Sequence, residues 1–175
     1  MITRRRKARE GVLEVLYRWD LLGDDPEQVL AEVLKRRRMP ESADEYCRRL
    51  VGRTVEERAH IDEVLAATLL HWNLDRLSFM DRAILRLACC ELLYVEDVPT
   101  TVSINEAVEL ARTFGDDRSS QFVNGVLDAI AHSHPRGAAT QSPPAGDPET
   151  ITGEDSTGTA PSGTVPPEIP ATGND

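Results

Sequence analysis

Apolar residues recur with helical spacing along most of the chain. One stripe has the i, i+3, i+4, i+7 spacing of an amphipathic helix: Val12, Val15, Leu16 and Trp19. The turn residues from Gly23 to Pro26 end this helix. Comparable stripes predict six further helices, at about residues 29–34, 46–55, 61–69, 84–92, 104–114 and 117–132. No alternating strand pattern competes with them, so the sequence predicts an all-α domain of about seven helices.

Local signals predict where the later helices begin and how they pack. Ser78 and Ser103 are each followed three residues later by an acidic residue, as in a capping box, so each is predicted to begin a helix. Gly115 is predicted to be the C-cap of the helix that follows Ser103. The segment from Ile84 to Leu92 is apolar around most of its circumference, which predicts a helix at the centre of the bundle.

Composition divides the chain at Pro135. Residues 135–175 contain eight prolines and six glycines but no aromatic residue, whereas residues 1–134 contain all eight aromatic residues. The net charge of −10 divides as well: residues 1–134 have 19 basic and 24 acidic side chains, and residues 135–175 have one basic and six acidic. The later segment lacks the apolar surface needed to offset the entropy of ordering it. We therefore predict a folded domain of residues 1–134 and a disordered acidic tail of residues 135–175.

The sequence excludes several classes of protein. No apolar run approaches the roughly 18 residues of a membrane-spanning helix. Acidic residues soon follow the basic start, which is unlike a signal peptide. Cys47, Cys89 and Cys90 offer neither a disulfide framework nor zinc-site spacing and are predicted to be small buried residues. These observations favour a reducing cytoplasm as the location and predict no membrane partner.

The sharpest candidate for function is a basic segment near the N-terminus. Five of its six residues are cations: Arg4, Arg5, Arg6, Lys7 and Arg9. They open a helix, where the helix dipole disfavours each cation by about 0.3–1 kcal/mol at low salt. A polyanion would compensate for this cost, so the segment predicts nucleic-acid binding, and replacing Arg5, Arg6 and Arg9 by alanine is expected to weaken binding without loss of thermal stability. The alternative is a frayed, solvated terminus in a chain that favours arginine over lysine.

A second basic run and three aromatic residues allow more than one interpretation. Residues 35–38 are all basic but end their helix, where the dipole favours cations, so a structural role is preferred, although the run would widen a positive surface. Trp19 and Phe122 lie on apolar stripes and are predicted to belong to the core. Tyr17 lies off its stripe, and its stacking on bases is left open.

Motifs for catalysis and metal binding are missing from the sequence. It contains no glycine-rich phosphate loop, no Gly-x-Ser-x-Gly elbow and no pair of cysteines or histidines at metal-site spacing. Many acidic residues lie on predicted helix surfaces, and none is singled out. We therefore predict that the protein is not an enzyme and has no cofactor and no metal site.

Several blocks of residues together resemble the NusB family of bacterial transcription antitermination factors. Near the N-terminus these are the arginine-rich start, Ala8–Glu10, and the pattern Leu16-Tyr17-x-Trp19. The later blocks are Asp81–Arg86, Asp97–Pro99, Ile104–Ala111 and Phe122–Asp128. They occur in the order of the family and cover roughly residues 4–131, while the acidic tail matches nothing in it.

The resemblance implies a seven-helix fold in two sub-bundles and a non-catalytic role. It implies binding to the boxA element of nascent ribosomal RNA transcripts together with NusE, a small-subunit ribosomal protein, in a complex that helps RNA polymerase resist premature termination. The basic segment matches the RNA-binding segment of the family.

The resemblance also marks sites on later helices. Arg118 and Phe122 lie near the family's RNA surface, and Arg118 stands where relatives can carry an acid, which is expected to strengthen RNA binding. Asp81 matches a position on the NusE-facing surface, and Arg82 and Arg86 on the same helix are further candidates for that surface.

Three polar or small residues in the family-like helices are predicted to be structural. Asn105 and Asn124 are interpreted as satisfying buried backbone groups or each other. Gly125 costs about 1 kcal/mol relative to alanine inside a helix, which a close contact between two helices would explain.

Three alternatives and one hypothesis about the tail stay open. The alternatives are a NusB-like domain of the kind attached to ribosomal RNA methyltransferases, a protein-interaction adaptor that does not touch RNA, and a homodimer as the free form. The first is disfavoured because no cofactor-binding α/β domain follows in this sequence. The acidic tail either competes weakly with RNA for the basic segment or is an inert solubilising extension, which is the preferred interpretation.

Overall fold

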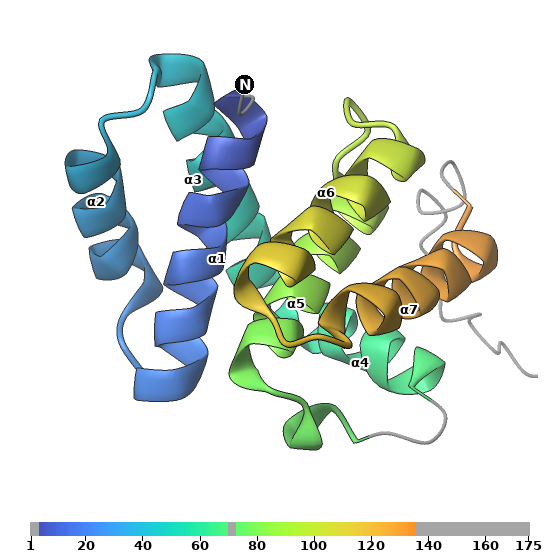
Figure 1. The fold of residues 1–175 in the computed structure, drawn as a ribbon. Coiled ribbons are helices and arrows are strands. Elements are labelled where there is room, and N and C mark those ends of the chain that lie inside the picture. The colour runs from blue at the N-terminus through green and yellow to red at the C-terminus, as the bar shows by residue number, and fades with distance from the viewer. Residues whose placement is uncertain (1–3, 70–72, 136–175) are drawn as a thin grey trace, which may run out of the picture. The chain divides into compact units, whose positions relative to one another are not determined.

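The described part of the protein is built from helices (Figure 1). The computed structural model describes residues 4–69 and 73–135, and within these ranges it has seven α-helices, one short 3₁₀ helix and no strand. The helices are α1 (Arg4–Leu22), α2 (Pro26–Arg37), α3 (Glu41–Glu56), α4 (Arg58–Thr68), η1 (Leu74–Arg76), α5 (Phe79–Tyr94), α6 (Thr100–Phe114) and α7 (Ser119–Ser133). The predicted all-α class and the number of helices are confirmed.

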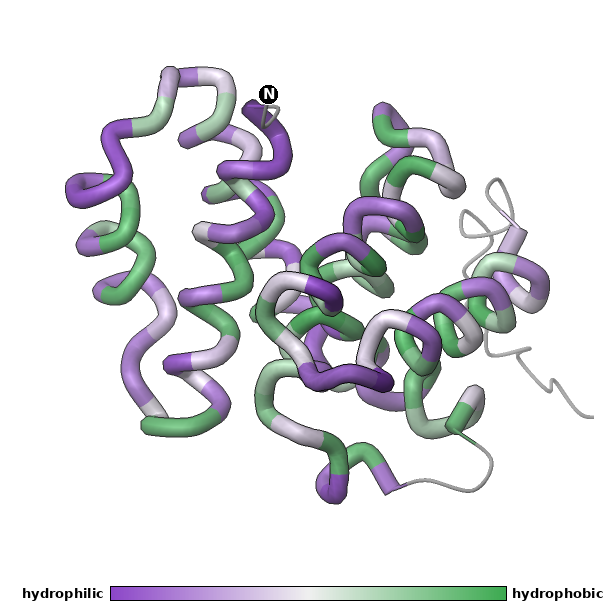
Figure 2. Tube along the Cα trace, in the orientation of Figure 1, coloured by the Kyte–Doolittle hydropathy of each residue, from purple (hydrophilic) through white to green (hydrophobic). Residues whose placement is uncertain are grey.

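The helices form two groups that meet along α5. In the first group α1 packs against α2 and α3, and in the second α5, α6 and α7 pack against one another with α4 beneath them (Figure 1). Both α1 and α3 also contact α5, which joins the groups. Figure 2 shows hydrophobic positions of α2 on the side that faces α1 and hydrophilic positions on its outer side. This is the amphipathic pattern that the apolar spacing predicts.

The central position predicted for the apolar helix is confirmed. Every residue of α5 from Asp81 to Leu92 is buried. Cys89 and Cys90 are fully buried within it, and Cys47 is fully buried in α3. Burial raises the pKa of the Cys90 thiol to about 11 and that of Cys47 to about 12. The three cysteines are therefore neutral thiols that serve as small core residues, as the sequence predicted.

One of the two predicted capping boxes is correct and the other is wrong. The Ser78 hydroxyl accepts a hydrogen bond from the backbone N–H of Asp81 and caps α5. Ser103, in contrast, lies inside α6, because that helix begins one turn earlier at Thr100. Pro99 is its N-cap, and the Pro99 carbonyl accepts from the backbone N–H of Ser103. The predicted C-cap at Gly115 is confirmed.

The structural roles predicted for Asn105, Asn124 and Gly125 are wrong. All three residues are exposed. The Asn124 amide donates to the Asp128 carboxylate on the next turn of α7 rather than to a buried backbone group. Nothing lies within 4 Å of the position that a Gly125 side chain would occupy. Helix-to-helix packing therefore does not explain this glycine.

The chain divides into two units, residues 1–142 and 143–175, and all described residues belong to the first. The predicted acidic tail lies outside the described residues except for Pro135. Within residues 4–69 and 73–135, no helix combines the length and the apolar character needed to cross a bilayer.

Two serine variants test the helix starts. Ser78→Ala removes the side-chain cap of α5 and is expected to lower the free energy of unfolding by about 1 kcal/mol. Ser103→Ala removes a buried hydroxyl that has no hydrogen-bond partner among the described residues, so it is expected to leave stability unchanged or raise it. Urea unfolding followed by circular dichroism measures both. Equal losses in the two variants would contradict these capping assignments.

Candidate nucleic-acid interface

The basic segment, residues 4–9, forms the first turns of α1. The first turn of this helix contains no acidic residue. Acidic residues at that position stabilise a helix, because they complement the positive end of its dipole. Arg4, Arg5 and Lys7 are exposed, Arg6 is half-buried and Arg9 is buried. The segment is therefore a regular helix whose cations point in different directions.

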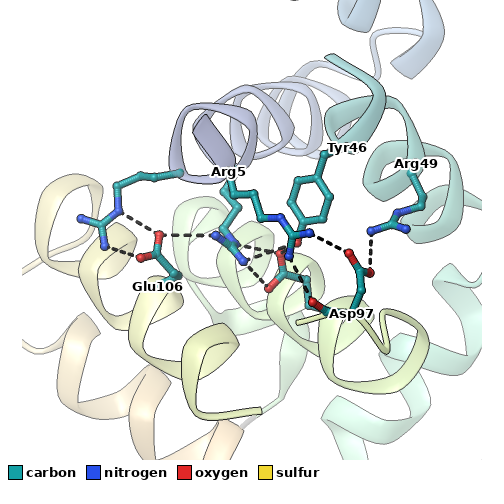
Figure 3. A network of polar contacts seen from close by, with 8 residues as sticks. Arg5, Tyr46, Arg49, Asp97 and Glu106 are labelled. Atoms are coloured by element: carbon teal, nitrogen blue, oxygen red, sulfur yellow. Dashed lines mark hydrogen bonds and ion pairs between the residues drawn. The ribbon is translucent and has the colours of Figure 1, made fainter. Parts of the chain in front are cut away.

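Acidic residues of α6 and of the connection between α5 and α6 compensate much of this charge. Arg5 donates to the Asp97 carboxylate at 2.7 Å (Figure 3). Arg6 forms a bidentate contact with the Glu106 carboxylate, in which both hydrogen bonds are 2.9 Å long. The sequence argument assigned the compensation of this charge to a polyanion and did not foresee these internal partners. It failed because Asp97 and Glu106 are about a hundred residues away in the chain and reach α1 only through the packing of α5 and α6.

Arg9 belongs to the core of the protein rather than to its surface. Its side chain is 2% exposed and its guanidinium donates to Glu91 of α5 at 2.7 and 3.1 Å. The Tyr46 hydroxyl of α3 donates to the same carboxylate. These contacts join α1, α3 and α5 in the interior. The prediction that Arg9 contacts RNA is corrected by this burial, because a strand on the surface does not reach it.

The ion pairs fix the ionisation of the groups around the segment. The hydrogen bond from Arg6, together with the charges of Arg9 and Arg6, outweighs burial and lowers the pKa of Glu106. The same hydrogen bond raises the pKa of Arg6. Burial and the neighbouring Glu91 raise the pKa of Tyr46, which therefore stays a neutral hydrogen-bond donor. At neutral pH Glu106 is therefore an anion that holds the Arg6 cation in place.

Sequence reasoning missed two residues that complete this surface. Tyr46 and Arg49 lie on α3, and the Arg49 guanidinium lies 5.2 Å from the centre of the Tyr46 ring. Arg5 lies over the same ring at 5.0 Å, and Arg49 shares the Asp97 carboxylate with Arg5. The apolar stripe at residues 46–55 includes Tyr46 but does not indicate its contacts with arginines. No local signal marks either residue, because both join the basic segment through tertiary packing.

The second basic run is tied to the first helix. Arg36 contacts the Glu14 carboxylate, and Arg37 contacts both Glu10 and Glu14 of α1. The run occupies the last turn of α2, where the dipole favours cations. These contacts agree with the structural role that was preferred for it.

The aromatic residues of α1 and the aromatic candidate on α7 are partly buried. Tyr17 and Trp19 are partly buried against the core, and the Arg58 guanidinium lies 4.7 Å from the Trp19 ring. Arg118 is exposed immediately before α7, and Phe122 is partly buried in its first turn. Arg6 of α1 donates to Glu106 of α6, and α7 packs on α6. The two predicted RNA-contacting regions, on α1 and α7, are therefore linked through α6.

The predicted partner-facing residues are largely engaged inside the protein. Arg82 donates to Asp20 at 2.5 Å and Arg86 contacts both Asp20 and Asp62, and these arginines are 8% and 4% exposed. The prediction that Arg82 and Arg86 face a partner is corrected: they join α5 to α1 and α4. Asp81 is also buried. One of its carboxylate oxygens accepts from Ser78, and the other has no hydrogen-bond partner among the described residues.

No grouping of three or more histidine, cysteine, aspartate or glutamate side chains suited to a metal ion occurs in residues 4–69 and 73–135. The chemistry that the described surface offers is recognition by charge and hydrogen bonding. It combines exposed guanidinium and ammonium groups with a fixed helical backbone.

Comparison with known proteins decides the family. The sequence model of the NusB family matches residues 6–132. The chain belongs to the NusB family. The NusB transcription antitermination protein of Bacillus pumilus is 41% identical over 127 residues, which are 73% of this chain and 94% of that protein. That of Oceanobacillus iheyensis is 44% identical over 126 residues, 72% of this chain and 97% of that protein.

Solved NusB structures share the fold. T. maritima NusB superposes with a TM-score of 0.72 at 40% identity and covers 77% of this chain and 94% of its own. A crystal structure of the antitermination factors NusB and NusE in complex with double-stranded RNA superposes with a TM-score of 0.70 at 32% identity, covering 77% of this chain and all of that one. The relatives named here are transcription antitermination proteins, in agreement with the predicted non-catalytic character.

The buried pair of Arg9 and Glu91 gives a stability prediction. Arg9→Ala leaves the Glu91 carboxylate buried without its cation and is expected to lower the free energy of unfolding by about 3–5 kcal/mol. The double variant Arg9→Met, Glu91→Met is expected to lose less than Arg9→Ala, because it removes both charges and fills the volume. Chemical denaturation of the three proteins measures this. Replacing Arg9 without loss of stability, as the sequence alone led us to expect, would contradict the structure.

The second buried cluster gives a pH prediction. Burial raises the pKa of Asp20, but hydrogen bonds from Arg82 and Arg86 lower it further than burial raises it. Because the pKa is lower in the folded than in the unfolded chain, the stabilisation is complete above the unfolded value of about 3.9 and is lost as the pH falls through the folded value. Asp20→Asn is expected to be less stable at pH 7 and to lose less stability than the unmodified chain on acidification from pH 5. Urea midpoints across that range measure this, and parallel pH profiles would contradict it.

Proposed function

We propose that this NusB-family protein binds the boxA element of nascent ribosomal RNA transcripts together with NusE and thereby helps RNA polymerase resist premature termination. The observation that carries the proposal is the set of exposed cations at the start of α1. Arg4, Arg5 and Lys7 face solvent, and the segment belongs to a fold shared with a solved complex of NusB, NusE and double-stranded RNA. A phosphate backbone supplies anions for Arg4 and Lys7 and further acceptors for Arg5, which already pairs with Asp97.

The mechanism is recognition by charge and shape. Arg5 and Arg6 are already held in place by Asp97 and Glu106, so little side-chain freedom is lost when a strand arrives. Arg4 and Lys7 are exposed and have no ion-pair partner among the described residues, so they are free to contact phosphates. Phosphate contacts position a strand, and exposed bases of single-stranded boxA then meet polar and aromatic groups on the helical surface.

A second contact region on α7 extends this surface. Arg118 is exposed at the start of the helix, and Phe122 is half-buried one turn later. Bases stack on aromatic side chains, and an arginine beside such a ring supplies a phosphate contact. We assign Arg118 and Phe122 to the far end of the RNA path, beyond the contacts made by the basic segment.

The NusE-facing surface is assigned to the end of α1 and the start of α5. Leu22 is 64% exposed and Phe79 is 38% exposed. Phe79 lies beside the contact between Asp20 and Arg82, since the Arg82 guanidinium is 4.9 Å from the Phe79 ring. Leu22 follows Asp20 by two residues at the end of α1. Exposed apolar side chains around a charged pair suit a protein partner. Asp81 lies on the same first turn of α5 as Phe79, but it is 8% exposed and its side chain accepts from Ser78, so it supports this surface from beneath.

One observation favours a second candidate function, that of a protein-interaction adaptor. The internal ion pairs of Arg5, Arg6 and Arg9 give these residues a structural role that needs no RNA. Pull-down of boxA RNA with and without NusE separates the candidates, because an adaptor captures RNA only through its partner.

Light scattering of the free chain decides whether it is a monomer or the homodimer that the family permits.

Salt dependence of RNA binding tests the proposed function directly. With Arg9 buried, three or four cations of the basic segment are available, so log K for boxA is expected to fall with log salt with a slope of about −2 to −3. The double variant Arg5→Ala, Lys7→Ala is expected to weaken binding and flatten the slope by about 1.4, since about 0.7 is lost per phosphate contact on a single strand. Fluorescence anisotropy with boxA and a scrambled RNA, each with and without NusE, measures both.

A matched control removes a cation from another part of the chain. Arg112→Ala deletes an exposed arginine of α6 that contacts Glu109 within its own helix, and it is expected to leave the slope unchanged. Binding that is independent of salt in the unmodified chain, both with and without NusE, would overturn the RNA assignment and leave the adaptor as the remaining candidate.

A further inference from the structure

A hollow opens beside the basic segment between three elements. Its volume is about 590 Å³, and its lining comes from the start of α1, from α3 and from the connection between α5 and α6. The lining residues are Arg4, Arg5, Ser42, Glu45, Tyr46, Arg49 and Asp97. Three of the seven are arginines and two are acids, so the hollow carries an excess of positive charge.

The floor of the hollow is an arginine-covered ring. Tyr46 is itself buried, and the guanidinium groups of Arg5 and Arg49 lie over its ring at 5.0 and 5.2 Å (Figure 3). Both side chains are half-exposed, at 46% and 51%. Stacking on the ring fixes their planes, and their exposed sides remain available for a base or a phosphate.

An acidic residue of the chain already occupies the position between the two arginines. Asp97 accepts from Arg5 at 2.7 Å and from Arg49 at 2.8 Å, one through each carboxylate oxygen. Although burial opposes it, the hydrogen bond from Arg49 and the charges of Arg49 and Arg5 lower the pKa of Asp97, so the group is an anion at neutral pH. Two anionic oxygens held by two guanidinium groups have the same arrangement as a bound phosphate.

The hollow keeps unused hydrogen-bonding capacity. Arg49 donates to Asp97 through one nitrogen only, and its two other guanidinium nitrogens have no hydrogen-bond partner among the described residues. Arg4 lines the hollow as well and has no ion-pair partner in the described part of the chain. A second anion therefore finds donors here without displacing Asp97 completely.

We propose that this hollow is a phosphate subsite for the RNA strand, with Arg49 of α3 as a phosphate-binding residue and Asp97 as a built-in competing anion. The inference rests on the proposed function and extends the RNA path from α1 onto α3. A phosphate enters beside Asp97 and accepts from the unused nitrogens of Arg49 and from Arg4. The negative charge of Asp97 weakens this contact, so it limits the affinity for RNA of any sequence.

The test compares two arginines that lie one turn apart on the same helix. Arg49→Ala is expected to weaken boxA binding about two- to fivefold and to flatten the salt slope by about 0.7, as for the loss of one exposed phosphate contact. Arg53→Ala is the matched control, because Arg53 also lies over a tyrosine ring, that of Tyr94, but outside the hollow. It is expected to leave both quantities unchanged. The free energy of unfolding, measured in parallel, shows that both variants are folded.

Asp97→Asn tests the competing anion in the opposite direction. It removes the charge but keeps the shape, and it is expected to tighten binding of boxA and of scrambled RNA alike by about two- to fivefold at low salt. If Arg49→Ala binds RNA like Arg53→Ala, or if Asp97→Asn binds more weakly than the unmodified chain, this inference is overturned while the proposed function stands. If the unmodified chain does not bind RNA at all, both are overturned.

Discussion

The contact on which the described structure most depends is the buried pair between Arg9 and Glu91. It joins the first helix to the central helix, and the Tyr46 hydroxyl brings α3 to the same carboxylate. A buried charge without its partner is costly, so the three helices are held in one arrangement. That arrangement sets where the exposed cations of α1 stand and which acids they meet. The position of the candidate RNA surface is therefore a consequence of a contact that RNA does not touch.

The charges around α1 are graded from the core to the surface. Arg9 is fully engaged, Arg5 and Arg6 have acidic partners but remain reachable, and Arg4 and Lys7 face solvent. A strand that arrives meets donors that are already oriented, which lowers the entropy lost on binding. The same acidic partners lower the affinity for RNA, because each one competes with a phosphate for its guanidinium. The ion pairs therefore order the basic segment at the expense of some affinity for RNA.

Sequence reasoning predicted the all-α class, the number of helices, the central helix and the buried cysteines, because apolar spacing and caps are local signals. It misplaced the start of α6, where Pro99 sets the helix start one turn before Ser103. It also took Arg9 as a surface residue, because charge alone does not reveal burial. The resemblance marked Arg82 and Arg86 as partner-facing from their place on the helix of Asp81, which does not reveal burial either. Their partners lie far away in the chain, as Glu91 does from Arg9, and only packing of the helices brings them together. Arg49 was missed for the same reason.

The central claim is that the basic segment is ordered by internal ion pairs before any RNA arrives. Hydrogen exchange of the RNA-free chain tests this at Ala8 and Arg9, whose backbone amides have their i−4 acceptors, Arg4 and Arg5, inside α1. The account predicts slow exchange at these amides in the unmodified chain and much faster exchange in Glu91→Gln. Fast exchange in the unmodified chain, with protection that appears only when boxA RNA is added, would contradict it.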